Sequence, residues 1–205
     1  MDDIVKTLVR KQEWDVNARL ADMQLSREGL LMARDVAVYE SGNATAFHPA
    51  NAAGTFAYHH GTWSLRERFV GKEWVEDRVD GIEAIRNESL KIKIAYCNVD
   101  LACNDQHEPQ PRSRKGAGAE RASGLSLFPD LPKYAPRVIG EYALYYLMVD
   151  EDGAAELTRP VMKNGRFNGT IERIYLSNGS RDVGVPLTED DTGPVDNFDP
   201  QVVRK

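Results

Sequence analysis

The residues between Arg112 and Arg121 bring cations and glycines together in an otherwise acidic chain. The segment contains four basic residues and two glycines, which leave backbone N–H groups accessible: Arg112, Arg114, Lys115, Gly116, Gly118 and Arg121. Such a segment suits a phosphate or a nucleic-acid backbone. It lacks the GxxxxGK[ST] spacing of a nucleotide-binding loop, and no aromatic residue alternates with the cations to stack on bases. The alternative interpretation is a solvated connecting loop.

A histidine pair is the second candidate. The triplet His60-Gly61-Thr62 follows His59. It resembles the triplet with which ADP-ribosyltransferases hold the nicotinamide ribose at a strand end. That resemblance implies a catalytic glutamate on a later strand, for which Glu141 and Glu172 are candidates that spacing does not separate. Adjacent histidines on a strand point to opposite faces, so we do not expect both to bind one metal. The alternative is one packed and one exposed histidine.

Carboxylates and lysines between positions 80 and 93 suggest a third chemistry, that of a metal-dependent nuclease. Such an enzyme needs an acidic residue on one strand and an E-x-K pattern on the next, to hold Mg²⁺ and orient water. The relevant residues are Asp80, Glu83, Glu88, Lys91 and Lys93. Glu88 precedes Lys91 by three positions, so in a strand their side chains point to opposite faces. The pattern therefore favours the charged outer face of a hairpin.

Other catalytic chemistry has weaker support. The chain contains no G-x-S-x-G pattern for a hydrolase. Cys97 and Cys103 form neither a CxxC pair nor a cluster with histidine, so we predict no zinc site, no other metal site and no cofactor. Two cysteines without a disulfide pattern favour a reducing, cytoplasmic setting in the host cell.

Composition restricts the partners. The net charge of −6 disfavours non-specific binding of nucleic acid by the whole surface, although a local basic patch remains compatible with it. No apolar run is long enough to span a bilayer, and the first residues are acidic where a secretory signal would be basic. We therefore expect a soluble protein without a membrane partner. Its oligomeric state is not encoded in any recognisable pattern.

The elements that would position these residues are helices first and strands later. The spacing of apolar residues predicts a helix over 2–24 and a second helix that begins after Ser26 as N-cap. Residues 41–54 read as a loop, and 56–67 mix strand and helix signals, with a capping-box pattern from Ser64 to Glu67. Alternation predicts a half-buried strand over 91–97, with its lysines on the solvent face, paired with 81–86.

The C-terminal half predicts a three-stranded meander. An apolar strand over 141–149 is followed by strands over 156–162 and 167–177, with an Asn164-Gly165 turn between the last two. The fold class is therefore α+β, with N-terminal helices packed on a mainly antiparallel sheet. We expect one domain over 1–187 with a long loop at 104–124. Residues 188–205 read as an extended acidic tail, which either docks on a basic partner or only aids solubility.

Three stretches, 54–69, 98–120 and 145–155, resemble an uncharacterised family of proteins found in tailed phages and prophages. The resemblance implies a mobile-element context and brings no catalytic residues with it. Together these features predict a non-catalytic accessory protein that binds nucleic acid, or a host protein that handles nucleic acid or acts in defence. The cationic segment would be its recognition element. The alternatives are a nuclease or ADP-ribosyltransferase, and a virion assembly component.

Overall fold

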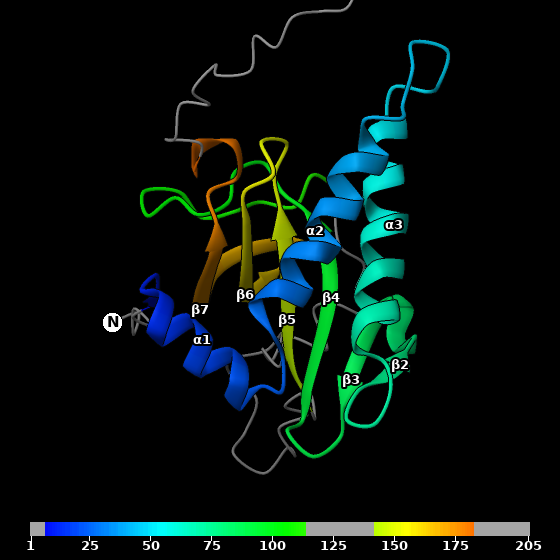
Figure 1. The fold of residues 1–205 in the computed structure, drawn as a ribbon. Helices are drawn as coiled ribbons and strands as arrows, with labels where there is room; N and C mark the ends of the chain where they lie inside the picture. The colour runs from blue at the N-terminus through cyan, green and yellow to red at the C-terminus, as the bar shows by residue number, and fades with distance from the viewer. Residues whose placement is uncertain (1–6, 114–141, 183–205) are drawn as a thin grey trace, which may run out of the picture.

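The computed structural model describes residues 7–113 and 142–182 (Figure 1). Its helices are α1 (Glu13–Asp22), α2 (Arg27–Ser41) and α3 (Ala52–Phe69). Its strands are β1 (Leu8–Arg10), β2 (Val75–Asp77), β3 (Ala84–Asn87), β4 (Ile92–Asn98), β5 (Ala143–Val149), β6 (Ala155–Lys163) and β7 (Arg166–Ser177). Short 3-10 helices cover Val79–Gly81 and Gly179–Asp182.

The strands form one sheet in the order β1-β7-β6-β5-β4-β3-β2. The pairs β2–β3, β3–β4, β5–β6 and β6–β7 are antiparallel, which confirms the predicted hairpin and the C-terminal meander. The pairs β4–β5 and β1–β7 are parallel, so the sheet is mixed. The α+β class is confirmed, and the mainly antiparallel sheet needs this correction. A parallel β4–β5 pair requires a crossover, which the chain makes between residues 99 and 142.

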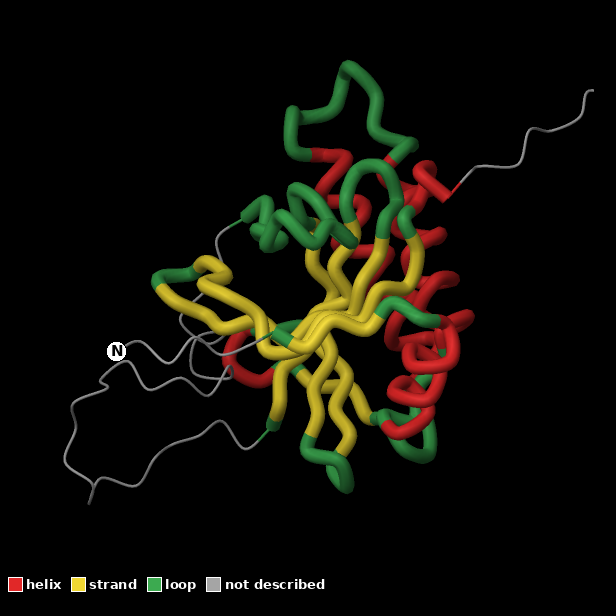
Figure 2. Tube along the Cα trace, turned by 90° about the vertical axis from the view of Figure 1, so that its left-hand side faces the viewer, coloured by secondary structure: helices red, strands yellow, loops and turns green. Residues whose placement is uncertain are grey.

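The helices lie on one face of the sheet, as the views in Figures 1 and 2 agree. Successive side chains of β4 and β5 point alternately to this face and to the other. Ile94, Tyr96 and Leu147 belong to the core beneath the helices, whereas Ala95 and Tyr146 belong to a second core on the opposite face. Because both faces are covered, β4 and β5 are buried along almost their whole length.

Gly61 allows α3 to lie close to the sheet. A Cβ atom at position 61 would stand 2.5 Å from the ring of Tyr96, a fully buried side chain of β4. Real Cβ atoms do not approach a ring so closely. The glycine of the His-Gly-Thr triplet is thus explained by packing between a helix and a strand. The triplet lies in the middle of α3, whereas the resemblance to ADP-ribosyltransferases implies a place at a strand end.

The first helix is attached to the sheet edge by a charged cluster around Glu172 of β7. Arg19 of α1 donates to both Glu172 oxygens at 3.0 Å, and Arg10 of β1 donates at 2.9 Å. The hydroxyl of Tyr145 adds a bond of 2.7 Å. Burial alone would raise the pKa of Glu172, but these hydrogen bonds and the Arg19 charge outweigh it and lower the pKa to about 2.

Three further expectations differ from the structure. The helix predicted over 2–24 is shorter, because residues 8–10 form β1, whose backbone pairs with β7. The mixed signals over 56–67 belong to α3, where the Ser64–Glu67 pattern lies inside the helix and caps nothing. The strand predicted to be half-buried is β4, which lies between β3 and β5 in the sheet. Its Lys93 side chain, expected on a solvent face, is only 8% exposed. In contrast, Ser26 is the N-cap of α2, since its hydroxyl accepts from the Gly29 N–H.

No helix among the described residues has the length and apolar character needed to cross a membrane. Cys97 and Cys103 are not joined by a disulfide. The acidic tail at 188–205 and the second half of the 104–124 loop lie outside the described residues.

We expect Gly61→Ala to lower the free energy of unfolding by about 1–3 kcal/mol, because overpacking against Tyr96 outweighs the helix-forming advantage of alanine. Gly54→Ala is the matched control on the same helix. Its Cβ would meet only ordinary contacts, and we expect a gain of up to about 1 kcal/mol. Urea denaturation measures both. Equal effects of the two substitutions would contradict the packing argument.

The Glu172 cluster predicts a pH dependence of stability. Because the pKa is lower in the folded chain, the stabilisation is complete above the unfolded value of about 4.3. It is lost as the pH falls through this value towards about 2. We expect the drop in unfolding free energy between pH 7 and pH 3 to be smaller in Glu172→Gln than in the original chain, measured by urea denaturation. An unchanged drop would show that Glu172 is not the responsible group.

Candidate functional site

The cationic segment predicted from the sequence is described only at its first residue. Arg112 is exposed, and its guanidinium pairs with Glu151 in the turn between β5 and β6. Its backbone N–H donates to the carbonyl of Asn98 at 3.1 Å, which holds the chain beside the end of β4. Arg114, Lys115, Gly116, Gly118 and Arg121 lie outside the described residues, so their role as a phosphate-binding segment remains a prediction.

The predicted ADP-ribosyltransferase residues are not brought together in the described chain. His60 lies on α3, with its Nε2 atom 3.9 Å from a carboxylate oxygen of Glu40 on α2. The side chains of adjacent helical residues point about 100° apart, so the imidazoles of His59 and His60 do not face the same ligand. Glu172 is held by Arg10 and Arg19 at the other edge of the sheet, and Glu141 lies outside the described residues. The triplet therefore gains no support from the fold.

The carboxylates near β2 to β4 form ion pairs instead of a metal site. Asp77, which sequence reasoning did not nominate, is buried and lies 2.7 Å from the Lys93 ammonium and 3.3 Å from the Arg86 guanidinium. Glu88 pairs with Arg86, and Glu83 with Arg66. No group of three potential metal ligands occurs among residues 7–113 and 142–182. The expectation that Glu88 and Lys91 point to opposite faces of a strand was wrong, because both lie in the turn between β3 and β4, where their charged groups are 3.5 Å apart. The buried Asp77 is neutralised by Lys93 and Arg86.

A buried ion pair that sequence reasoning missed organises the opposite face of the sheet. Glu156 of β6 is fully buried, and Arg173 of the neighbouring β7 is 3% exposed. The guanidinium binds the carboxylate with two bonds, of 3.0 and 2.7 Å. Thr158 donates a further bond to Glu156 at 2.6 Å. The sequence does show a charged residue at an inward-facing position of each strand, Glu156 in one and Arg173 in the other. It does not show that the pairing of the two strands brings these residues into contact.

This pair holds the described part of the predicted long loop. The remaining Arg173 nitrogen donates to the carbonyls of Asn104 and His107 at 2.9 and 3.0 Å. Glu156 accepts from the Cys103 N–H at 2.7 Å. Asp150, at the end of β5, accepts from the Ala102 N–H at 3.0 Å. Residues 99–112 are therefore bound to three side chains of the sheet, and not a free polar connector.

Asp100 stabilises the same loop through hydrogen bonds to other residues of the loop. Its carboxylate accepts from the backbone N–H groups of Leu101 and Gln110 and from the ring of His107. Burial opposes ionisation here, but these bonds outweigh it and lower the pKa of Asp100. The loop thus carries its own charged centre, in addition to the bonds that hold it to the sheet.

A pocket of about 500 Å³ opens where this loop meets the end of β7. Its lining is polar and comes from four separate segments: Lys11, Arg27, Cys103, Asn104, Asp105, Gln106, Tyr175, Leu176, Ser177 and Asn178. Cys103 lies at this pocket, but burial raises the pKa of its thiol to about 12, and the thiol donates to the Ala155 carbonyl. A thiol that stays protonated is a poor nucleophile, so Cys103 is not activated for covalent chemistry.

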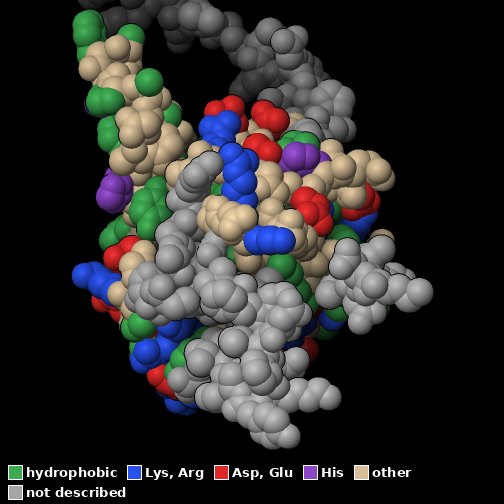
Figure 3. Space-filling model, turned by 180° about the vertical axis from the view of Figure 1, so that it is seen from behind, with side chains coloured by type: hydrophobic (Ala, Val, Ile, Leu, Met, Phe, Trp, Pro, Cys, Tyr) green, Lys and Arg blue, Asp and Glu red, His purple; other side chains and the backbone are tan. Residues whose placement is uncertain are grey.

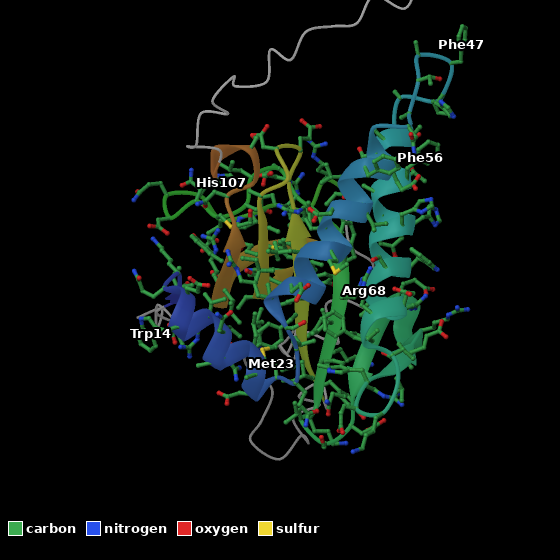
Figure 4. All side chains as sticks on the ribbon, viewed as in Figure 1. Trp14, Met23, Phe47, Phe56, Arg68 and His107 are labelled. Atoms are coloured by element: carbon green, nitrogen blue, oxygen red, sulfur yellow. The ribbon has the colours of Figure 1, made fainter. Side chains whose placement is uncertain are left out.

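The second exposed feature is the tip formed by residues 42–55, which comprises the connection between α2 and α3 and the first turn of α3. It projects beyond the ends of the strands (Figure 1). Phe47 lies at its apex and points away from the body of the protein (Figure 4), with 101% of its reference surface exposed. The tip is folded, because the Thr45 N–H and hydroxyl contact Nδ1 of His48, and the His48 ring packs edge-on against Phe56 at 5.3 Å.

The tip has a distinct chemical character. Residues 42–55 contain no Asp, Glu, Lys or Arg. Seen from behind in Figure 3, the projecting part carries hydrophobic and uncharged polar side chains, whereas the body shows acidic and basic ones side by side. The described residues thus offer two candidate sites at separate places: a polar pocket beside β7 and an uncharged, aromatic tip.

Comparison of this chain with protein-family models, with curated proteins and with solved structures finds no match. The resemblance to phage and prophage proteins accordingly stays a prediction, and the functional argument depends on the geometry of the described residues.

We expect Glu156→Gln to lower the free energy of unfolding by about 3–5 kcal/mol, because it leaves the Arg173 charge buried without its counter-ion. Amide hydrogen exchange at residues 102–107 should accelerate, since this loop depends on the pair. Glu151→Gln, at an exposed carboxylate paired with Arg112, is the matched control, with an expected effect below about 1 kcal/mol. A stability unchanged in Glu156→Gln would contradict this role.

Proposed function

We propose that the protein is a non-catalytic accessory protein that binds a protein partner through the α2–α3 tip. The observation that carries the proposal is the complete exposure of Phe47 at the apex of a folded projection. Burying a phenylalanine side chain is worth about 1.5–3 kcal/mol, so a fully exposed one leaves that free energy available for an interface. Aromatic anchors of this kind dominate many protein interfaces when they fill a pocket of the partner.

Charge favours a protein over nucleic acid as the partner of the tip. Nucleic-acid binding depends on cations that neutralise phosphates, and the tip at 42–55 has none. A side chain that wedges between bases also needs nearby cations to hold the backbone. An apolar apex with an uncharged polar surround instead favours a protein surface that offers an apolar pocket with an uncharged rim.

The rest of the described chain supports a binding role over catalysis. The candidate carboxylates are neutralised by lysine and arginine, and His60 and Glu172 lie on different parts of the fold. The mobile-element context implied by the resemblance makes a host protein that handles nucleic acid, or acts in defence, the natural partner class. Direct binding of nucleic acid by the segment Arg112–Arg121 remains a separate prediction.

The test is capture of a partner from bacterial extract by the tagged protein, in parallel with Phe47→Ala and Trp14→Ala. Trp14 is the matched control, since it is an aromatic side chain that is 74% exposed on α1, away from the tip. We expect at least one protein to be retained by the original chain and by Trp14→Ala and to be lost with Phe47→Ala. That protein, once purified, should bind at least tenfold more weakly to Phe47→Ala, since an anchor residue contributes about 2 kcal/mol or more.

Three outcomes would contradict the proposal. One is an identical set of captured proteins with Phe47→Ala. Another is loss of the captured protein after nuclease treatment of the extract, which would make nucleic acid the bridging ligand. The third is self-association of the original chain that Phe47→Ala abolishes in analytical ultracentrifugation, which would make a second copy the occupant of the tip.

A further inference from the structure

The pocket beside β7 has the dimensions of a small-molecule site and a preformed wall. Its volume of about 500 Å³ lies within the range of ligand pockets, about 300–1,000 Å³. One wall is residues 103–106, which the buried Glu156–Arg173 pair holds through the Cys103 N–H and the Asn104 carbonyl. A wall fixed before binding lowers the ordering cost that a ligand would otherwise meet.

Two cations of the pocket retain unused donors. Arg27, at the start of α2, donates through Nε and Nη2 to the Leu176 carbonyl, with Nε at 2.9 Å. Its Nη1 group has no acceptor within residues 7–113 and 142–182. The Lys11 ammonium pairs with one oxygen of Asp105, and an ammonium can donate three bonds. The pocket therefore presents several N–H donors to an incoming group, from the Arg27 guanidinium and from a Lys11 ammonium that is already paired with Asp105.

One carboxylate accompanies these cations. Asp105 accepts from Lys11 and, at 3.0 Å, from the Tyr175 hydroxyl. Bonds from Lys11 and Tyr175 lower the pKa of Asp105, so it stays ionised at neutral pH. Each carboxylate oxygen can accept two hydrogen bonds, so Asp105 has capacity for a further donor. The site thus combines two cations with one acceptor, which suits an anionic group carried on a molecule with hydroxyl groups.

We infer that this pocket binds a small phosphate monoester, with the phosphate at Lys11 and Arg27 and a hydroxyl group of the same molecule donating to Asp105. A phosphate monoester carries about −1.5 to −2 charges at pH 7 and three acceptor oxygens, which matches two cations with several free donors. A simple carboxylate would satisfy only part of this set. Nucleotides and sugar phosphates share the required chemistry, and the site lies apart from the α2–α3 tip, so it does not depend on the proposed partner.

Isothermal titration calorimetry with AMP, ribose 5-phosphate, inorganic phosphate and adenosine tests the inference. We expect both AMP and ribose 5-phosphate to bind more tightly than inorganic phosphate, and adenosine to give no binding. Lys11→Gln should weaken the phosphate ester about tenfold, since it removes a charge-assisted hydrogen bond at an exposed residue that the fold does not need. Lys72→Gln is the matched control, because Lys72 is 92% exposed at the far edge of the molecule.

A second variant separates the two halves of the site. Asp105→Asn should reduce the preference for ribose 5-phosphate over inorganic phosphate, because the acceptor for the hydroxyl group loses its charge. The inference is overturned if neither ester binds at about 10 mM, if Lys11→Gln binds them as tightly as the original chain, or if adenosine binds as well as AMP. AMP binding without ribose 5-phosphate binding would make the base the recognised group and would also overturn it.

Discussion

The structure of one face of this protein depends on a buried ion pair, Glu156 with Arg173. A charge buried without a partner is costly, so each of these residues is tolerable only because the other lies on the neighbouring strand. Their spare hydrogen-bonding capacity then goes to the backbone of residues 103–107. A single electrostatic requirement therefore links β6 to β7 and holds residues 103–107, which form one wall of the pocket.

The two candidate sites differ in how far apart their residues lie in the sequence. The pocket beside β7 is assembled from segments far apart in the chain and depends on the buried pair for its shape. The α2–α3 tip is local, and its form depends on a helix, a short turn and a second helix. Gly61 lets α3 lie directly on Tyr96, so the helix from which the tip projects is held against the sheet. An exposed aromatic residue on such a support is preorganised for contact.

The expectations that proved accurate were those with local causes. Ser26 caps α2 because its hydroxyl reaches the Gly29 N–H three residues later. The Asn164-Gly165 turn joins β6 to β7 because both residues adopt positive φ. The expectations that failed had distant causes: β1 exists because β7 offers it an edge, and Lys93 is buried because Asp77 reaches it from β2. These contacts join residues far apart in the chain, so they cannot be predicted from the spacing of residue types.

By itself, the sequence determined the α+β class, the hairpin of β3 and β4, and the meander of β5 to β7, because periodicity and turn residues act over a few positions. It also showed that the usual catalytic patterns are incomplete. Tertiary structure alone decided that β4 and β5 are parallel and central, that Glu156 meets Arg173, and that Lys11, Arg27 and Asp105 line one pocket. The physical reason is that these residues are joined by packing and charge across strands, and such contacts leave no regular interval in the chain.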